Sequence, residues 1–150
     1  MDIDFEMEIW KHQREIHWAA AVWQGILFLA LILTSRSGLG QGEFGIGVWG
    51  GSLLLCLILA GPTLMFSLLT NYALWRVWTF DRVVYTINKV VAVLGMLVGG
   101  FFSVVYWDSV QNDPRAGREE LGFLKFFLLM FFVHLSSLLI SKFLKYVQSI

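Results

Sequence analysis

Residues 90–107 read VVAVLGMLVGGFFSVVYW and contain no charged side chain. An apolar stretch of about 18 residues or more is typical of a transmembrane helix, because roughly 20 residues rising about 1.5 Å each cross a hydrocarbon core of about 30 Å. Extending the stretch to residues 83–107 adds one charged residue, Lys89. The sequence therefore predicts a membrane span over residues 83–107.

Three further stretches have the same character, at residues 17–34, 45–74 and 121–146. The second of these is long enough to require a tilt or a kink, which Gly61 and Pro62 would supply. Residues 1–16 form an acidic N-terminal segment, and the connections between the spans are short. We therefore predict an all-α integral membrane protein, an antiparallel bundle of four transmembrane helices over residues 17–147.

The composition supports a membrane environment. Of the 150 residues, 57% are hydrophobic and 15% are charged, against about 45–50% and about 25% in soluble domains. The core of a water-soluble domain of 150 residues cannot bury so much apolar surface. The lipid bilayer is therefore the expected partner. The formal net charge is zero, which gives no basic field for nucleic acid.

The distribution of lysine and arginine predicts the orientation, because positively charged loops tend to stay in the cytoplasm. One side of the predicted bundle carries Lys11, Arg14, Arg76, Arg82, Lys89, Lys142 and Lys145, and the other carries Arg36, Arg115, Arg118 and Lys125. This difference favours a cytoplasmic location for both termini. We expect a multi-pass protein of a plasma membrane, such as the bacterial inner membrane.

The sequence offers no recognisable catalytic, cofactor or metal site. Cys56 is the only cysteine, which excludes an internal disulfide and any site with several cysteine ligands. There is no G-x-S-x-G or H-E-x-x-H motif. The predicted depths of His17 and His134 differ by about 15 Å, too much for two ligands of one haem. We therefore expect a protein that is not an enzyme and holds no cofactor.

Two sets of residues inside the spans are candidates for helix contacts and for a polar site. Small residues on shared faces allow close helix approach within the bundle or between copies of the chain; they are Ser52, Cys56, Ala60, Thr63, Gly95, Gly99 and Ser103. Polar residues gather in the predicted cytoplasmic half, where they could line a vestibule or docking socket; they are His17, Gln24, Asn71, Asn88, Lys89, His134, Ser137 and Ser141.

The N-terminal segment alternates between acidic and apolar side chains. The acidic ones are Asp2, Asp4, Glu6 and Glu8, and they are candidates for contact with a partner protein. Period-two alternation predicts a half-buried strand that would pair with a second chain. The alternative interpretation is a frayed tail that leads into a helix near Trp10.

These features predict a non-enzymatic membrane subunit that self-associates and anchors or regulates a cytoplasmic partner. An oligomeric ion pore, or a membrane effector of a toxin-immunity or phage-defence system, is the first alternative. A haem- or quinone-binding respiratory subunit is the second.

Overall fold

The described part of the chain is almost entirely helical and contains no strand. The computed structural model covers residues 1–150 and describes all of them except 1–2, 40–53, 55, 77–80 and 116. The helices are α1 (Ile3–Lys11), α2 (Gln13–Leu39), α4 (Gly61–Arg76), α5 (Asp81–Asn112) and α6 (Arg118–Ser149). The predicted all-α class is therefore confirmed for these residues.

Among the described residues, three helices are long and apolar enough to cross a membrane. They cover Gln13–Thr34, Asp81–Asn112 and Glu120–Ser149, and they contain the predicted spans at residues 17–34, 83–107 and 121–146. The predicted span at 45–74 lies partly outside the described residues. Its described part ends in α4, which has 16 residues.

The helical residues before α4 end in a turn next to Gly61 and Pro62, the two residues at which the sequence predicted a kink. Residues 56–59 are helical, Ala60 is a turn, and α4 begins at Gly61. The Ala60 amide donates to the Cys56 carbonyl at 2.9 Å, and the Leu64 amide donates to the Ala60 carbonyl at 3.0 Å. Pro62 has no amide hydrogen and occupies the first turn of α4, where proline removes no intrahelical hydrogen bond.

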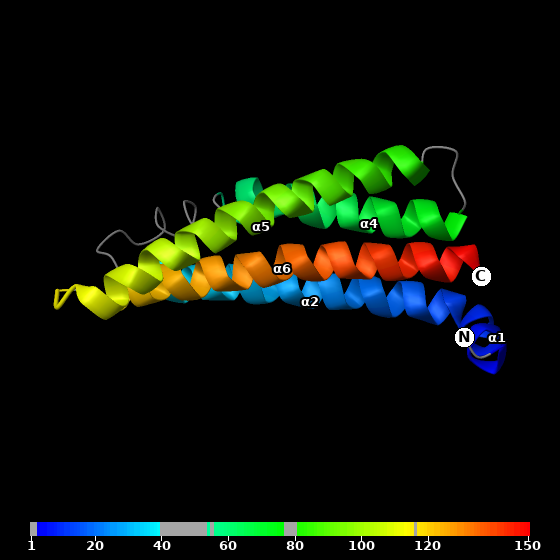
Figure 1. The fold of residues 1–150 in the computed structure, drawn as a ribbon, viewed down its shortest axis with the longest axis horizontal. Coiled ribbons are helices and arrows are strands. Elements are labelled where there is room, and N and C mark those ends of the chain that lie inside the picture. The colour runs from blue at the N-terminus through cyan, green and yellow to red at the C-terminus, as the bar shows by residue number, and fades with distance from the viewer. Residues whose placement is uncertain (1–2, 40–53, 55, 77–80, 116) are drawn as a thin grey trace.

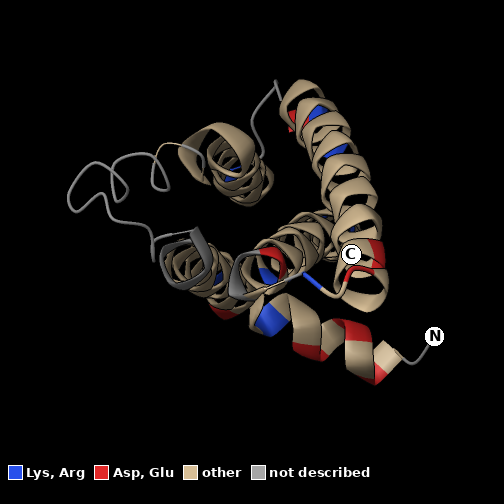
Figure 2. Ribbon diagram, turned by 90° about the vertical axis from the view of Figure 1, so that its left-hand side faces the viewer, with Lys and Arg blue, Asp and Glu red and all other residues tan. Residues whose placement is uncertain are grey.

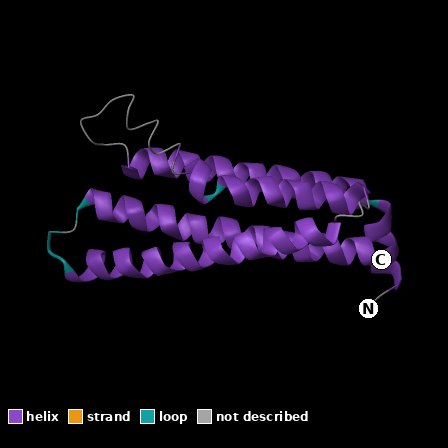
Figure 3. Cartoon of the chain, turned by 90° about the horizontal axis from the view of Figure 1, so that it is seen from above, coloured by secondary structure: helices purple, strands orange, loops and turns teal. Residues whose placement is uncertain are grey.

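The helices α2, α4, α5 and α6 lie lengthwise beside one another and alternate in direction (Figure 1). α6 packs against α2, α4 and α5, and α4 also contacts α2 and α5. The C-terminus, the end of α4 and the start of α5 lie at the same end of the bundle as α1 (Figures 1 and 3). The alternating directions agree with the predicted antiparallel packing of neighbouring helices.

The predicted N-terminal strand is wrong, because this segment forms the helix α1. The helix begins at Ile3, well before the start near Trp10 that the frayed-tail interpretation gave. At about 100° per residue, Ile3 and Met7 share one face, and Asp4 and Glu8 share the next. Acidic residues in the first turn also favour a helix, since they offset the positive end of its dipole.

The helix α1 lies across the end of the bundle rather than along its axis. Figure 1 shows it turning away at the start of α2, and Figure 2, viewed along the bundle, shows it from the side. Of its apolar side chains, Ile9 is buried, whereas Ile3, Phe5, Met7 and Trp10 are exposed. α1 therefore leaves most of its apolar surface uncovered by the rest of the chain.

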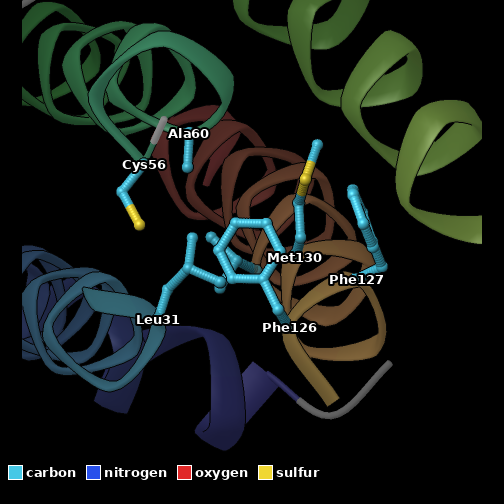
Figure 4. Close-up of a cluster of buried hydrophobic side chains, with 7 residues drawn as sticks. Leu31, Cys56, Ala60, Phe126, Phe127 and Met130 are labelled. Atoms are coloured by element: carbon cyan, nitrogen blue, oxygen red, sulfur yellow. The ribbon is translucent and has the colours of Figure 1, made fainter. Parts of the chain in front are cut away.

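The apolar core lies toward the other end of the bundle. Phe126 of α6 is fully buried in a cluster that includes Leu31 of α2 and the small residues Cys56 and Ala60 (Figure 4). Tyr106 of α5 stacks on Phe123 and Phe127 of α6, with ring centroids 5.1 and 5.8 Å apart. This packing fills one half of the bundle with apolar side chains.

Candidate functional site

A continuous run of hydrogen bonds crosses the half of the bundle nearer the termini. Gln24 of α2 bonds Ser67 of α4, and the Ser67 and Ser137 hydroxyls lie 2.9 Å apart. Ser137 of α6 donates to Asn88 Oδ1 at 3.4 Å, and Asn88 Nδ2 donates to Ser141 Oγ at 2.7 Å. All five side chains are buried. The run ties the four long helices to one another.

These hydrogen bonds share one direction. The Gln24 amide nitrogen donates to Ser67. Ser137 has a single hydroxyl hydrogen, which it donates to Asn88, so Ser67 must donate to Ser137. Asn88 then donates to Ser141. Each member accepts from the member before it, and bonds aligned in this way polarise and strengthen one another.

A second polar pair joins α2 to α4 nearer the end of the bundle. His17 Nδ1 bonds Asn71 Oδ1, and Asn71 Nδ2 donates to the His17 carbonyl at 2.8 Å. Because Asn71 Oδ1 can only accept, His17 Nδ1 carries the hydrogen of this bond. Both residues line an open groove of about 190 Å³, whose other walls are Trp18, Ala21, Leu68, Tyr72 and Trp75.

Glycines bring α5 and α6 close together beside the polar run. A Cβ atom at Gly95 would overlap the His134 imidazole, and one at Gly99 would lie 2.9 Å from the Phe131 amide nitrogen. His134 Nδ1 bonds the Met130 carbonyl at 2.7 Å, and its Nε2 is buried without a partner among the described residues. The lack of a side chain at Gly95 therefore leaves the space that the His134 imidazole occupies.

The structure places the predicted packing residues inside a single chain. Ser52 lies outside the described residues, and the other members are all buried: Cys56, Ala60, Thr63, Gly95, Gly99 and Ser103. They line contacts among the chain's own helices. A contact between copies of the chain would have to use a different surface.

The structure brings most of the predicted vestibule residues together. Lys89 is exposed on the outer face of α5. The remaining members are buried: His17, Gln24, Asn71, Asn88, His134, Ser137 and Ser141. Among the described residues they are mostly bonded to one another or to Ser67, so the network links the helices to one another.

Sequence reasoning missed three contacts. Ser67 was expected among the polar residues of the cytoplasmic half, on one helical face with Thr63 and Thr70, but its role as the link between α2 and α6 was not. Trp23 Nε1 donates to Ser136 at 3.0 Å, and Gln13 Nε2 donates to the Val147 carbonyl at 3.2 Å. The last two join positions more than 100 residues apart, and no sequence pattern indicates such a pairing.

The predicted partner contacts lie mainly on the polar face of α1. Asp2 is outside the described residues, Asp4 and Glu8 are exposed, and Glu6 is partly exposed. Among the residues that the structure describes, no group of three or more histidine, cysteine, aspartate or glutamate side chains could hold a metal ion.

No protein-family model, curated protein or solved structure matches this chain. Its function must therefore be argued from its own geometry.

Proposed function

We propose that the protein is a non-enzymatic membrane component that presents α1 to a cytoplasmic protein partner. In this proposal the bundle spans the membrane four times, and residues 45–74 form a span in addition to the three long apolar helices. Both termini lie in the cytoplasm. The location is a plasma membrane, such as the inner membrane of a bacterium. The observation that carries the proposal is α1, an exposed two-faced helix set across the end of an apolar bundle.

The two faces of α1 suit a helix at a membrane surface. Ile3, Met7 and Trp10 follow the i, i+4, i+7 spacing of one face and are exposed. Such an apolar strip would enter the boundary between head groups and acyl chains. The adjoining strip, with Asp4 and Glu8, would then face the cytoplasm. It is acidic, so its natural partner is a basic protein surface rather than anionic lipid.

The polar interior supports a structural role rather than chemistry. The buried amides and hydroxyls of Gln24, Ser67, Asn88 and Ser137 bond one another. Interhelical hydrogen bonds of this kind contribute about 0.6 kcal/mol each in membrane proteins. Several of them would hold the helices in one arrangement and so fix the position of α1.

Deleting residues 2–9 tests the proposal. The shortened protein should still insert in the membrane, because the long apolar helices are untouched, but it should no longer recover its partner in a pull-down. A matched variant, D4N/E8Q, removes the charge and keeps the helix, and it should weaken recovery while membrane insertion stays unchanged. Recovery of every partner at the original level by the deleted protein would refute the proposal.

Self-association is the second part of the proposal. Because the small-residue faces are buried within the chain, copies would meet through outward apolar surfaces such as that of α5, which exposes Leu94, Leu97 and Phe101. The mass of the purified protein in detergent, measured by light scattering, decides this. A strictly monomeric mass at all concentrations would remove self-association.

An oligomeric pore is the competing function, favoured by the gathering of polar side chains in one half of the bundle. The other half contains the apolar cluster around Phe126, which a pore would have to bypass or use as a hydrophobic gate. Ion flux into liposomes that changes with Lys89→Gln would favour the pore. Absence of flux under all conditions would favour the partner-binding component.

A further inference from the structure

Two residues that each carry an unpaired polar atom line one small cavity. Gln24 and Thr63 line it together with Ser67 and Ser137, and its volume is about 10 Å³. Gln24 is 5% exposed and Thr63 is 1% exposed. Neither Gln24 Oε1 nor Thr63 Oγ1 has a hydrogen-bond partner among the described residues. Burying such groups unpaired is costly, typically about 1–3 kcal/mol each.

The cavity has the size and the chemistry of a site for one water molecule. A buried water needs a space of at least about 10–15 Å³ and two or more polar partners. We propose that a single water molecule binds here, accepts a hydrogen bond from the Thr63 hydroxyl and donates one to Gln24 Oε1. One water molecule in the cavity would then give both Thr63 Oγ1 and Gln24 Oε1 a hydrogen-bond partner.

The donor-to-acceptor direction of the hydrogen-bond run agrees with a water molecule at this position. Gln24 begins the run by donating from its amide nitrogen to Ser67, and its carbonyl oxygen is the acceptor that lacks a donor. A water that donates to this oxygen extends the run backward to Thr63. The extended run then passes from Thr63 through water, Gln24, Ser67, Ser137 and Asn88 to Ser141, always in one direction.

The same lining argues for water rather than a cation. The other lining residues are apolar, namely Leu27, Phe28, Leu64 and Val133, and none of the described residues that border the cavity is charged. A cation in this position, inside a membrane bundle, would lack a countercharge and would be costly to bury. Water satisfies the same oxygen atoms without introducing a charge.

Thr63→Val tests the proposal, because a hydroxyl bonded to water and an unpaired hydroxyl predict opposite changes in the thermal midpoint. Thr70 provides the matched control, since it is fully buried and its hydroxyl donates to the Phe66 carbonyl at 2.7 Å. If water occupies the cavity, Thr63→Val and Thr70→Val should each lower the thermal midpoint in detergent, by about 2–4 °C. If the Thr63 hydroxyl is unpaired, Thr63→Val should raise the midpoint, which would overturn the proposal.

Solid-state NMR on the full chain in lipid vesicles gives a second, independent measurement. Magnetisation should pass from water protons to the Thr63 side chain at short mixing times and should not reach Thr70. Absence of transfer to Thr63 would overturn the proposal. So would a thermal midpoint that rises in sodium chloride relative to choline chloride and loses this rise in Thr63→Val, because that result would assign the cavity to a cation.

Discussion

The backbone of α6 lies close to Gly99 of α5, but not to the neighbouring Gly100. A Cβ atom at Gly99 would lie 2.9 Å from the Phe131 amide nitrogen and 3.1 Å from the Phe127 carbonyl oxygen. Both are backbone atoms, which cannot move without shifting the helix. At Gly100 the nearest atom would be Phe131 Cδ2, at an ordinary 3.6 Å. Two consecutive glycines thus have different structural roles.

This difference predicts opposite effects of the same substitution. Gly99→Ala should lower the free energy of unfolding by about 1–3 kcal/mol, because the added methyl forces the helices apart. Gly100→Ala should leave it unchanged or raise it by up to about 1 kcal/mol, since alanine is the better helix former. Thermal unfolding of both variants in the same detergent measures the effect. Equal midpoints for the two variants would show that α5 and α6 do not pack through Gly99.

At this scale the sequence predicted the residue types but not their connections. Spacing at 100° per residue placed Gly95, Gly99 and Ser103 on one face of their helix, and all three are buried. It did not indicate that Asn88 would bond Ser141, because this pairing depends on how far α5 slides along α6. That offset is fixed by the packing of whole helices, which no local pattern contains.

Among the elements, α1 shows how a single pattern supports two structures. Alternation of acidic and apolar residues over residues 2–9 predicts a strand when a neighbouring strand is available to pair with the backbone. In the described part of the chain there is no strand, so the segment satisfies its backbone within a helix instead. In a helix Ile3 and Met7 share one strip and Asp4 and Glu8 share the next, whereas Phe5 and Glu6 lie outside both strips. Local sequence alone does not decide between these outcomes.

The two strips of α1 predict different access to water. Met7→Cys places a thiol on the apolar strip, and Glu8→Cys places one on the acidic strip, one residue away. The label is a membrane-impermeant maleimide, added to lipid vesicles on the side where α1 lies. With α1 on the membrane surface, position 8 should be labelled several times faster than position 7. Cys56 is fully buried and should add little background. Similar labelling rates at the two positions would show that α1 does not lie on the bilayer.

For the whole molecule, composition and span length predicted the helical membrane architecture, and three of the predicted spans fall within helices long enough to cross. The helices α2, α4, α5 and α6 alternate in direction (Figure 1). The prediction of orientation rests on the larger number of lysine and arginine residues at one end of the bundle. This difference acts when the chain is inserted into the membrane, and not through the packing of the helices. The fold alone therefore does not fix which end faces the cytoplasm.

The orientation can be measured at two exposed positions at opposite ends of the bundle. Arg115 lies in the connection between α5 and α6, and Ile150 ends the chain after α6. If positive charges keep both termini inside, Arg115→Cys should react with an impermeant maleimide added to intact cells. Ile150→Cys should react only after the membrane is permeabilised. The reverse pattern would place α1 outside the cell, where it could not meet a cytoplasmic partner, so this measurement tests the proposed function together with the topology.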